Sequence, residues 1–262
     1  MNKSEGFILI DNKNNIAIFQ EAIKTRCSRR KYIPETLEFS AAAKLQELID
    51  EYNAEEKVNM RLVLDNGDAF NGFRKSYGMF SGVRNYIGLI GDKNDFVNVE
   101  KLGYYGEMLV LHATSLGLGT CWVGGTFSRK DCPFDLSEDE SIIGAITIGR
   151  VSQDLNAKEK LIRRLTHRKT KAIEQMYISE SSVPDWFSSG MEAVRFAPSA
   201  VNRQPVIFTY KDGNVTAAVK NITGEGFALD LGIAKLHFEI GAVGGTWQFG
   251  NGAAFVKNDN IK

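Results

Sequence analysis

The sequence predicts a mixed fold of helices and strands that is divided into two halves of unequal length. Short apolar runs closed by turn residues alternate with longer segments in which apolar residues recur at helical spacing. A Ser-rich break at residues 179–182, followed by Pro184, interrupts this alternation and is the best candidate for a boundary. After the break, the earlier order of elements returns in a shorter form. We therefore expect two related halves.

Before the break, the pattern predicts three helices and four strands. The helices are expected over residues 16–25, 40–49 and 106–116. The last of them is strongly apolar and carries few charges, so we expect it to be central. The strands are expected at residues 7–10, 60–64, 86–90 and 142–148. A glycine-rich stretch follows at residues 117–125, and residues 156–176 are dense in Lys and Arg.

After the break, a helix, two strands and a second helix are expected, followed by a glycine-rich turn. Their predicted positions are residues 186–196, 206–210, 215–219 and 227–240. An offset of 125 residues aligns the ends of the two apolar helices and the glycine-rich stretches after them. The identities at this offset are Leu111 with Leu236, His112 with His237, Gly119 with Gly244 and Trp122 with Trp247. This match indicates a duplication, although it is short.

Composition excludes several classes of protein. Lys and Arg number 32, as do Asp and Glu, so no overall basic field is present to attract nucleic acid or an anionic membrane. The three cysteines, Cys27, Cys121 and Cys132, lack the regular spacing of a disulfide framework or a zinc site, which favours a reducing compartment. No apolar run reaches the length of a membrane span. We expect a cytoplasmic protein.

The first candidate binding segment is basic and runs from Arg26 to Arg30. Two or three guanidinium groups and the hydroxyl of Ser28 at a helix end can bind a phosphate dianion through charge-assisted hydrogen bonds. The alternative is a solvated basic cluster on a helix surface.

The second candidate segment is the glycine-rich stretch that includes Gly119, Gly124 and Gly125. A backbone without side chains can lie flat against a ligand and direct its N–H groups at it. The alternative is an ordinary helix C-cap followed by a turn.

The third candidate segment covers residues 197–205. Pro198 fixes a turn after a helix, and Ser199 and Asn202 present short polar groups from that turn. The alternative is a turn that stops a helix and leads into an edge strand.

Two further stretches could add contacts. The basic run at residues 163–169 follows a predicted strand, and Arg168 and Lys169 are its candidates for binding phosphate, with Arg163 or Arg164 as substitutes. A solvated helix face explains any single one of these residues equally well. Ser81 lies just before another predicted strand and is a weaker candidate.

Taken together, these segments resemble the flavin-binding segments of the nitroreductase family, the FMN-dependent NAD(P)H oxidoreductases. The resemblance implies an α+β fold in which each half has a mainly antiparallel sheet flanked by helices. In that family each FMN lies at a dimer interface, with segments like the first two from one subunit and a segment like the third from its partner. Here one chain holds each segment once, which resembles the subgroup in which two half-dimers are fused. We expect residues 1–180 and 181–262 to be those halves, with a single complete flavin site.

The resemblance also assigns roles to individual positions. Arg26 and Ser28 would contact the phosphate or ribityl oxygens, and Arg30 would reach the N1/O2 edge of the flavin ring. Backbone N–H groups of Gly124 and Gly125 would meet flavin N5 and O4. No residue is expected to be catalytic, because the flavin carries the chemistry, and no metal ligand is expected. The full set of expected cofactor-binding residues is Arg26, Cys27, Ser28, Arg30, Ser81, Trp122, Val123, Gly124, Gly125, Arg168, Lys169, Pro198, Ser199, Ala200 and Asn202.

The resemblance implies an oxidoreductase in which NAD(P)H reduces FMN and a nitroaromatic, quinone or similar small molecule then accepts the electrons in a ping-pong order. The alternative is a flavin-binding or redox-sensing protein with little turnover, and a third possibility is a related fold that has lost its flavin. We expect neither nucleic acid nor a membrane as partner. A monomer is compatible with a chain that already mimics a dimer.

Overall fold

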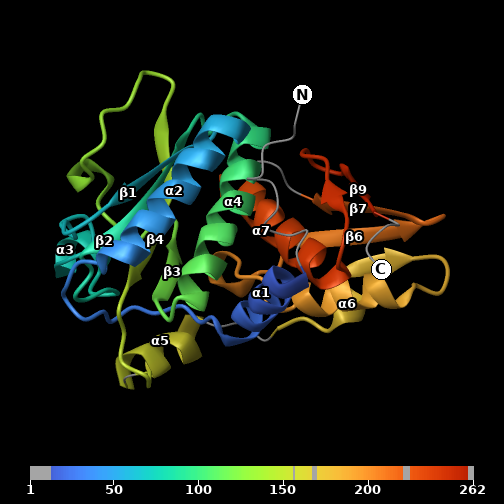
Figure 1. Cartoon of the computed structure of the whole chain (residues 1–262), viewed down its shortest axis with the longest axis horizontal. Coiled ribbons are helices and arrows are strands. Elements are labelled where there is room, and N and C mark those ends of the chain that lie inside the picture. Colours follow the sequence, from blue (N-terminus) through green and yellow to red (C-terminus); the bar gives the residue numbers. More distant parts are fainter. Residues whose placement is uncertain (1–12, 156, 167–169, 221–224, 259–262) are drawn as a thin grey trace.

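Two helices lie between two sheets at the centre of the molecule (Figure 1). The structure, a computed structural model, describes residues 13–258 except 156, 167–169 and 221–224. Helices α4 (Phe96–Ser115) and α7 (Glu225–Ala242) form the central pair. Their apolar residues belong to one core cluster that also contains Leu45 from the first half and Val215 from the second. The central position expected for the first of these helices is confirmed.

The first sheet is antiparallel throughout. Its strands are β1 (Asn59–Val63), β2 (Asn85–Gly91), β4 (Ser141–Gly149) and β3 (Gly119–Val123), in that spatial order. Strand β2 is buried along its whole length and β4 almost so, which explains why both read as continuous apolar runs rather than as alternating ones.

The second sheet repeats the order of the first. Its strands are β5 (Tyr177–Ser179), β6 (Val206–Lys211), β7 (Asn214–Val219), β9 (Ala254–Val256) and β8 (Thr246–Trp247). The four strands from β6 to β8 pair antiparallel and follow the order of β1, β2, β4 and β3. Strand β5 precedes residue 181 in the chain, yet it pairs parallel with β6. The α+β class is confirmed, and the matching strand orders fit a duplicated unit.

Further helices and 3₁₀ turns surround these layers in the part of the chain that the structure describes. Helix α2 covers the first sheet, and α6 and α1 lie beside α7 (Figure 1). The remaining helices and 3₁₀ turns are short and occur in connections. The bounds are α1 Lys13–Thr25, α2 Phe39–Glu56, α3 Phe73–Ser76, α5 Ala157–Thr166, α6 Asp185–Val194, η2 Arg129–Asp131, η3 Ile173–Gln175 and η4 Ala200–Asn202.

The structure refines two sequence predictions. Helix α4 begins ten residues before the predicted start at 106, where the Asp95 side chain caps it by accepting a 3.0 Å hydrogen bond from Asn98 N. The glycine-rich stretch contains both a helix C-cap and strand β3. Gly117 takes a left-handed conformation, and Leu118 N donates to Ala113 O as in a Schellman motif. The strand predicted at residues 7–10 lies outside the described residues.

Candidate functional site

The first and second predicted segments lie side by side. Ser28 forms a parallel bridge with Thr120 of β3, and Arg29 N donates to Thr120 O at 2.8 Å. On the opposite side, Ser81 N donates to Arg30 O at 3.0 Å, so the basic segment runs between β3 and Ser81. Three stretches that are far apart in the sequence therefore meet here.

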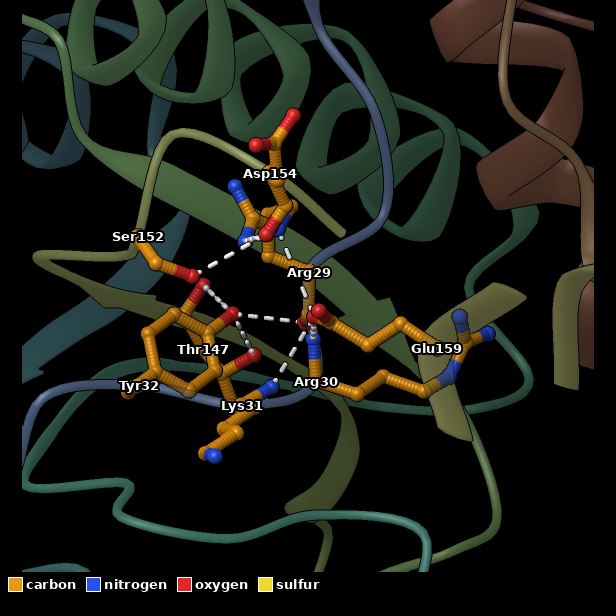
Figure 2. Close-up of polar contacts among 8 residues, drawn as sticks. All are labelled: Arg29, Arg30, Lys31, Tyr32, Thr147, Ser152, Asp154 and Glu159. Carbon is orange, nitrogen blue, oxygen red and sulfur yellow. Dashed lines mark hydrogen bonds and ion pairs between the residues drawn. The ribbon is translucent and has the colours of Figure 1, made fainter. Parts of the chain in front are cut away.

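Glu159 of α5 anchors the basic segment by accepting hydrogen bonds from it (Figure 2). Its Oε1 atom accepts hydrogen bonds from Arg30 N at 2.7 Å and Lys31 N at 3.1 Å, and it pairs with Arg29 Nε at 3.3 Å. Arg29 also donates to Asp154 O and is only 6% exposed. Arg29 is thus committed to the protein interior, which leaves Arg26 and Arg30 as the segment's candidates for binding an anion.

Tyr32 fixes the end of the same segment to the sheet. Its hydroxyl lies 2.8 Å from Thr147 Oγ1 on β4 and donates to Arg29 O at 2.9 Å (Figure 2). Burial raises the pKa of this phenol well above its ordinary value, so it stays neutral.

Arg26 connects the first segment with the third. Its Nη1 donates to Phe196 O at 3.2 Å, immediately before residues 197–205. Its Nε lies 3.8 Å from Glu107 Oε1 and is buried without a hydrogen-bond partner. A buried guanidinium N–H in this condition is unusual, because buried donors are nearly always paired.

The third segment forms a tight turn around η4. Val201, Asn202 and Gln204 all have positive φ, at 46°, 52° and 47°, which is costly for residues with side chains. Two hydrogen bonds stabilise this strained conformation: Gln204 N donates to Ser199 Oγ at 2.9 Å, and Ala200 N donates to Asp230 Oδ1 at 3.1 Å. The short polar residues predicted here are therefore partly used to hold the turn itself.

Lys171 joins the third segment to the chain that follows the basic run. Its backbone N donates to Gln204 Oε1 and its Nζ to Gln204 O, both at 2.8 Å. The two residues predicted from that run, Arg168 and Lys169, lie outside the described residues.

Asp230 of α7 lies beneath the third segment and is 5% exposed. Burial raises the pKa of its carboxyl to about 7, and the Ala200 N–H and Arg203 only partly oppose that rise. The carboxyl also borders a small, mostly apolar pocket. The pocket is lined by Met176, Val194, Ala197, Pro198, Ser199, Gln204, Pro205, Val206, Asp230 and Ala234.

The end of β3 offers open backbone. Gly124 and Gly125 are exposed, and a Cβ atom built on either would meet nothing within 4 Å. Val123 is buried and pairs with Ala145 in the sheet, whereas Trp122 turns toward α4 and donates from Nε1 to Glu107 Oε2 at 2.6 Å. Cys27, in the basic segment, is half-buried.

In the second half, the backbone that corresponds to Gly124 and Gly125 is already occupied by contacts within the protein. At the offset of 125, Phe249 and Gly250 match Gly124 and Gly125. Gly250 N donates to Glu100 Oε2 at 2.7 Å, and the Phe249 ring packs 5.5 Å from that of Tyr104. Lys235 Nζ lies 2.5 Å from Glu100 Oε1 and also donates to Gly250 O, with both charged side chains fully buried.

Four polar residues that shape the site are not among those predicted from the sequence: Glu107, Glu159, Lys171 and Asp230. Glu107 and Asp230 carried a usable signal, because an acid within a strongly apolar helix must find a buried partner. Glu159 and Lys171 carried none, since both lie in a stretch rich in charges.

A family model described as "Putative TM nitroreductase" matches residues 18–242. The comparison with curated proteins gives no match. Among the described residues, no helix combines the length and apolar character needed to cross a membrane.

A solved structure supports the fold, and two others show partial similarity. A "putative nitroreductase" from Thermotoga maritima MSB8 aligns with a TM-score of 0.63 at 20% identity, covering 93% of this chain and 94% of its own. A nitroreductase family protein from Clostridium difficile 630 aligns with a TM-score of 0.45 at 20% identity, over 63% of this chain and 98% of its own. An FMN-dependent nitroreductase from Clostridium difficile R20291 gives 0.42 at 19% identity, over 56% and 97%.

Proposed function

The chain belongs to the family described as "Putative TM nitroreductase", and from that premise we propose that it is an FMN-dependent oxidoreductase that uses NAD(P)H to reduce a small acceptor. When bound, FMN would supply the redox chemistry, taking a hydride from NAD(P)H and then passing electrons to a nitroaromatic, quinone or similar molecule in ping-pong order. The observation that carries the proposal is that one chain brings all three flavin-like segments together.

The residues at this place fit a flavin. Arg26 has a buried Nε without a hydrogen-bond partner, so a donor is left over for a ligand. Gly124 and Gly125 present open backbone at the end of β3. The strained turn at residues 200–204 is held by Asp230 and Ser199, and backbone strain of this kind clusters at ligand-binding sites.

We assign the roles accordingly. Arg26 and Ser28 would bind the phosphate or ribityl oxygens, since guanidinium groups favour phosphate oxygens, and Arg30 would reach the N1/O2 edge of the flavin ring. Gly124 and Gly125 would offer backbone N–H groups to the ring, and Ser199 and Asn202 would bind from the second half. The assignments that accompany these are Cys27, Ser81, Trp122, Val123, Pro198 and Ala200, together with Arg168 and Lys169.

We propose one flavin per chain, held between a first half of residues 1–180 and a second of residues 181–262. The place that corresponds to Gly124 and Gly125 holds Phe249 and Gly250, and the N–H of Gly250 is already bonded to Glu100. A flavin there would have to displace a buried ion pair, which is costly. A chain built in this way can act as a monomer, and the cytoplasm stays its predicted location.

The test is to release and count the flavin of the purified protein, and then to follow NADH and NADPH oxidation with and without a quinone or nitroaromatic acceptor. One FMN per chain and acceptor-dependent oxidation, with parallel double-reciprocal plots, are expected. One tightly held FMN without turnover would instead favour a flavin-binding or redox-sensing protein. No FMN, even after incubation, would overturn the proposal.

A matched pair of variants locates the site. Arg30→Ala should weaken FMN binding about 10-fold or more, because the charge-assisted contact proposed for Arg30 at the N1/O2 edge of the flavin ring is lost. Arg150→Ala removes an arginine that is 54% exposed and paired with Glu35, and FMN affinity should not change. Equal affinities in the two variants would contradict the assignment of Arg30.

A further inference from the structure

A single buried carboxylate, that of Glu107, lies where several elements converge. Its Oε2 accepts a hydrogen bond from Trp122 Nε1 at 2.6 Å, and its Oε1 lies 2.9 Å from His237 Nε2. Arg26 Nε lies 3.8 Å from the same Oε1. The Glu107 and His237 side chains are completely buried, and the Arg26 side chain is 10% exposed.

Each of these contacts leads to a different predicted flavin segment. Arg26 belongs to the first segment and Trp122 to the second. His237 reaches the third indirectly, because its Nδ1 lies 3.1 Å from Ala193 O on α6, the helix that ends just before residues 197–205. Arg26 also contacts the start of the third segment, because it donates a hydrogen bond to Phe196 O. One carboxylate therefore contacts residues from both halves of the chain.

The hydrogen-bonding capacity of these groups fixes their roles. A carbonyl oxygen can only accept, so His237 Nδ1 carries the proton in its contact with Ala193 O. The Trp122 indole can only donate, so it presents its N–H to the Glu107 carboxyl, whereas the Arg26 guanidinium lies at ion-pair distance from that carboxyl without a hydrogen bond to it. Removing that carboxyl would leave three buried groups without their acceptor or counter-charge, and Arg26 would lose what orients it.

We propose that Glu107 is a positioning residue for the flavin site, a role that rests on the proposed function. It does not reach the cofactor. Its contacts keep Arg26, β3 and α6 in the mutual arrangement that the three segments need in order to bind one flavin. The contact with α6, in the second half, is made through His237.

The same helix provides a matched control. Glu100 lies two turns earlier on α4, is equally buried, and pairs with Lys235 of α7, two residues before His237. Its other contact is with Gly250 N, which corresponds to Gly125 in the first half. Glu100 thus shares the burial, helix and type of partner of Glu107, but not its contacts with the flavin segments.

The experiment compares Glu107→Gln with Glu100→Gln in the full chain. Both should lower the free energy of unfolding, because each leaves a buried cationic or imidazole partner without its carboxylate. Only Glu107→Gln should raise the FMN dissociation constant, by about 10-fold or more, since its amide would present a donor to Arg26. Only Glu107→Gln should also change the visible circular dichroism of the bound flavin at saturation, which loss of stability alone would leave unaltered.

A third variant, His237→Asn, keeps a donor for Ala193 O but removes the ring nitrogen that contacts Glu107 Oε1, and it should weaken FMN binding by a smaller factor. It decides the question if Glu107→Gln does not fold. An FMN affinity and spectrum in these variants equal to those of the wild type would overturn the role of Glu107 alone. A wild-type protein that binds no FMN would overturn the proposed function and this role with it.

Discussion

Buried acidic side chains in this protein differ in what compensates for their burial. Glu100 has Lys235 as a buried cationic partner, and Glu159 has Arg29. Asp230 relies mainly on the N–H of Ala200, with Arg203 adding a weaker attraction. Because a buried carboxylate without a close cation is costly, burial dominates its pKa. Asp230 is therefore an acid whose protonation state should respond to pH near neutrality.

The first prediction follows from that pKa. The folded protein holds the Asp230 proton up to about pH 7, whereas the unfolded group loses it near 3.8, so the free energy of unfolding falls as pH rises through this window. The loss amounts to at most about 4 kcal/mol. Asp230→Asn keeps an acceptor for Ala200 N but has no carboxyl group that ionises. Its free energy of unfolding should therefore not fall in this way, and it should be more stable than the wild type at pH 8.

Urea unfolding at pH 5 and pH 8 measures this effect. The advantage of Asp230→Asn should be larger at pH 8, and Asp139→Asn, which removes the same charge from an exposed position, should show no such trend. Equal pH dependence of the wild type and Asp230→Asn would contradict the prediction.

At the same scale, the sequence indicated a basic segment but not the direction of each side chain. Arg29 turns inward to Glu159, while Arg26 turns toward Phe196. Both are arginines in a short irregular stretch, where no periodicity tells one face from the other. The choice depends on the position of α5, and no local pattern encodes that position.

At the scale of elements, the central helices cross at glycines. A Cβ atom on Gly232 of α7 would lie 2.0 Å from Glu100 O, and one on Gly103 of α4 would lie 2.3 Å from Leu229 O. The close approach of α4 and α7 therefore requires both glycines. It also brings Glu107 within reach of His237, so the crossing contributes to the proposed flavin site.

The second prediction tests this crossing. Gly232→Ala should lower the free energy of unfolding by about 2 kcal/mol or more, since the methyl group would meet backbone atoms that cannot move aside easily. Gly226→Ala lies on the same helix, and its Cβ would approach nothing nearer than Ala200 Cβ at 4.0 Å. That control should be neutral or slightly stabilising. Similar losses in both variants, measured by urea unfolding, would disprove the special role of the crossing.

Element positions were largely predictable because they depend on local patterning. The strand at 86–90 and the helix at 227–240 correspond to β2 and α7. Strand β3 was not predicted, because the glycines at 117–125 read as a turn. Its five residues are held in the sheet by β4, a partner that is distant in sequence.

At the scale of the whole molecule, the two halves share a hydrophobic core, beside which the first half has a smaller cluster of its own. Strand β5 precedes the proposed boundary but pairs with β6, and α4 packs along α7. One apolar cluster contains residues of both halves, including Leu109 and Phe238. Such a core cannot lose one half without exposing the other.

The third prediction is therefore a single cooperative unfolding transition. The three tryptophans report on separate places: Trp122 lies on β3, while Trp186 and Trp247 lie in the second half. In Trp122→Phe, fluorescence follows the second half alone, and its transition in urea should coincide with that of far-UV circular dichroism. Two separated transitions would show that the halves unfold independently.

The sequence by itself determined the alternation of elements, the repeat at an offset of 125 and the three segments that resemble a flavin site, because each depends on residues close together in the chain. Only the tertiary structure decided which polar groups meet. Glu107 lies 15 residues from Trp122 and 130 from His237, and it reaches both because of how α4 packs against β3 and α7. Such contacts depend on packing angles and on the closure of long loops, which local patterns of polarity do not encode.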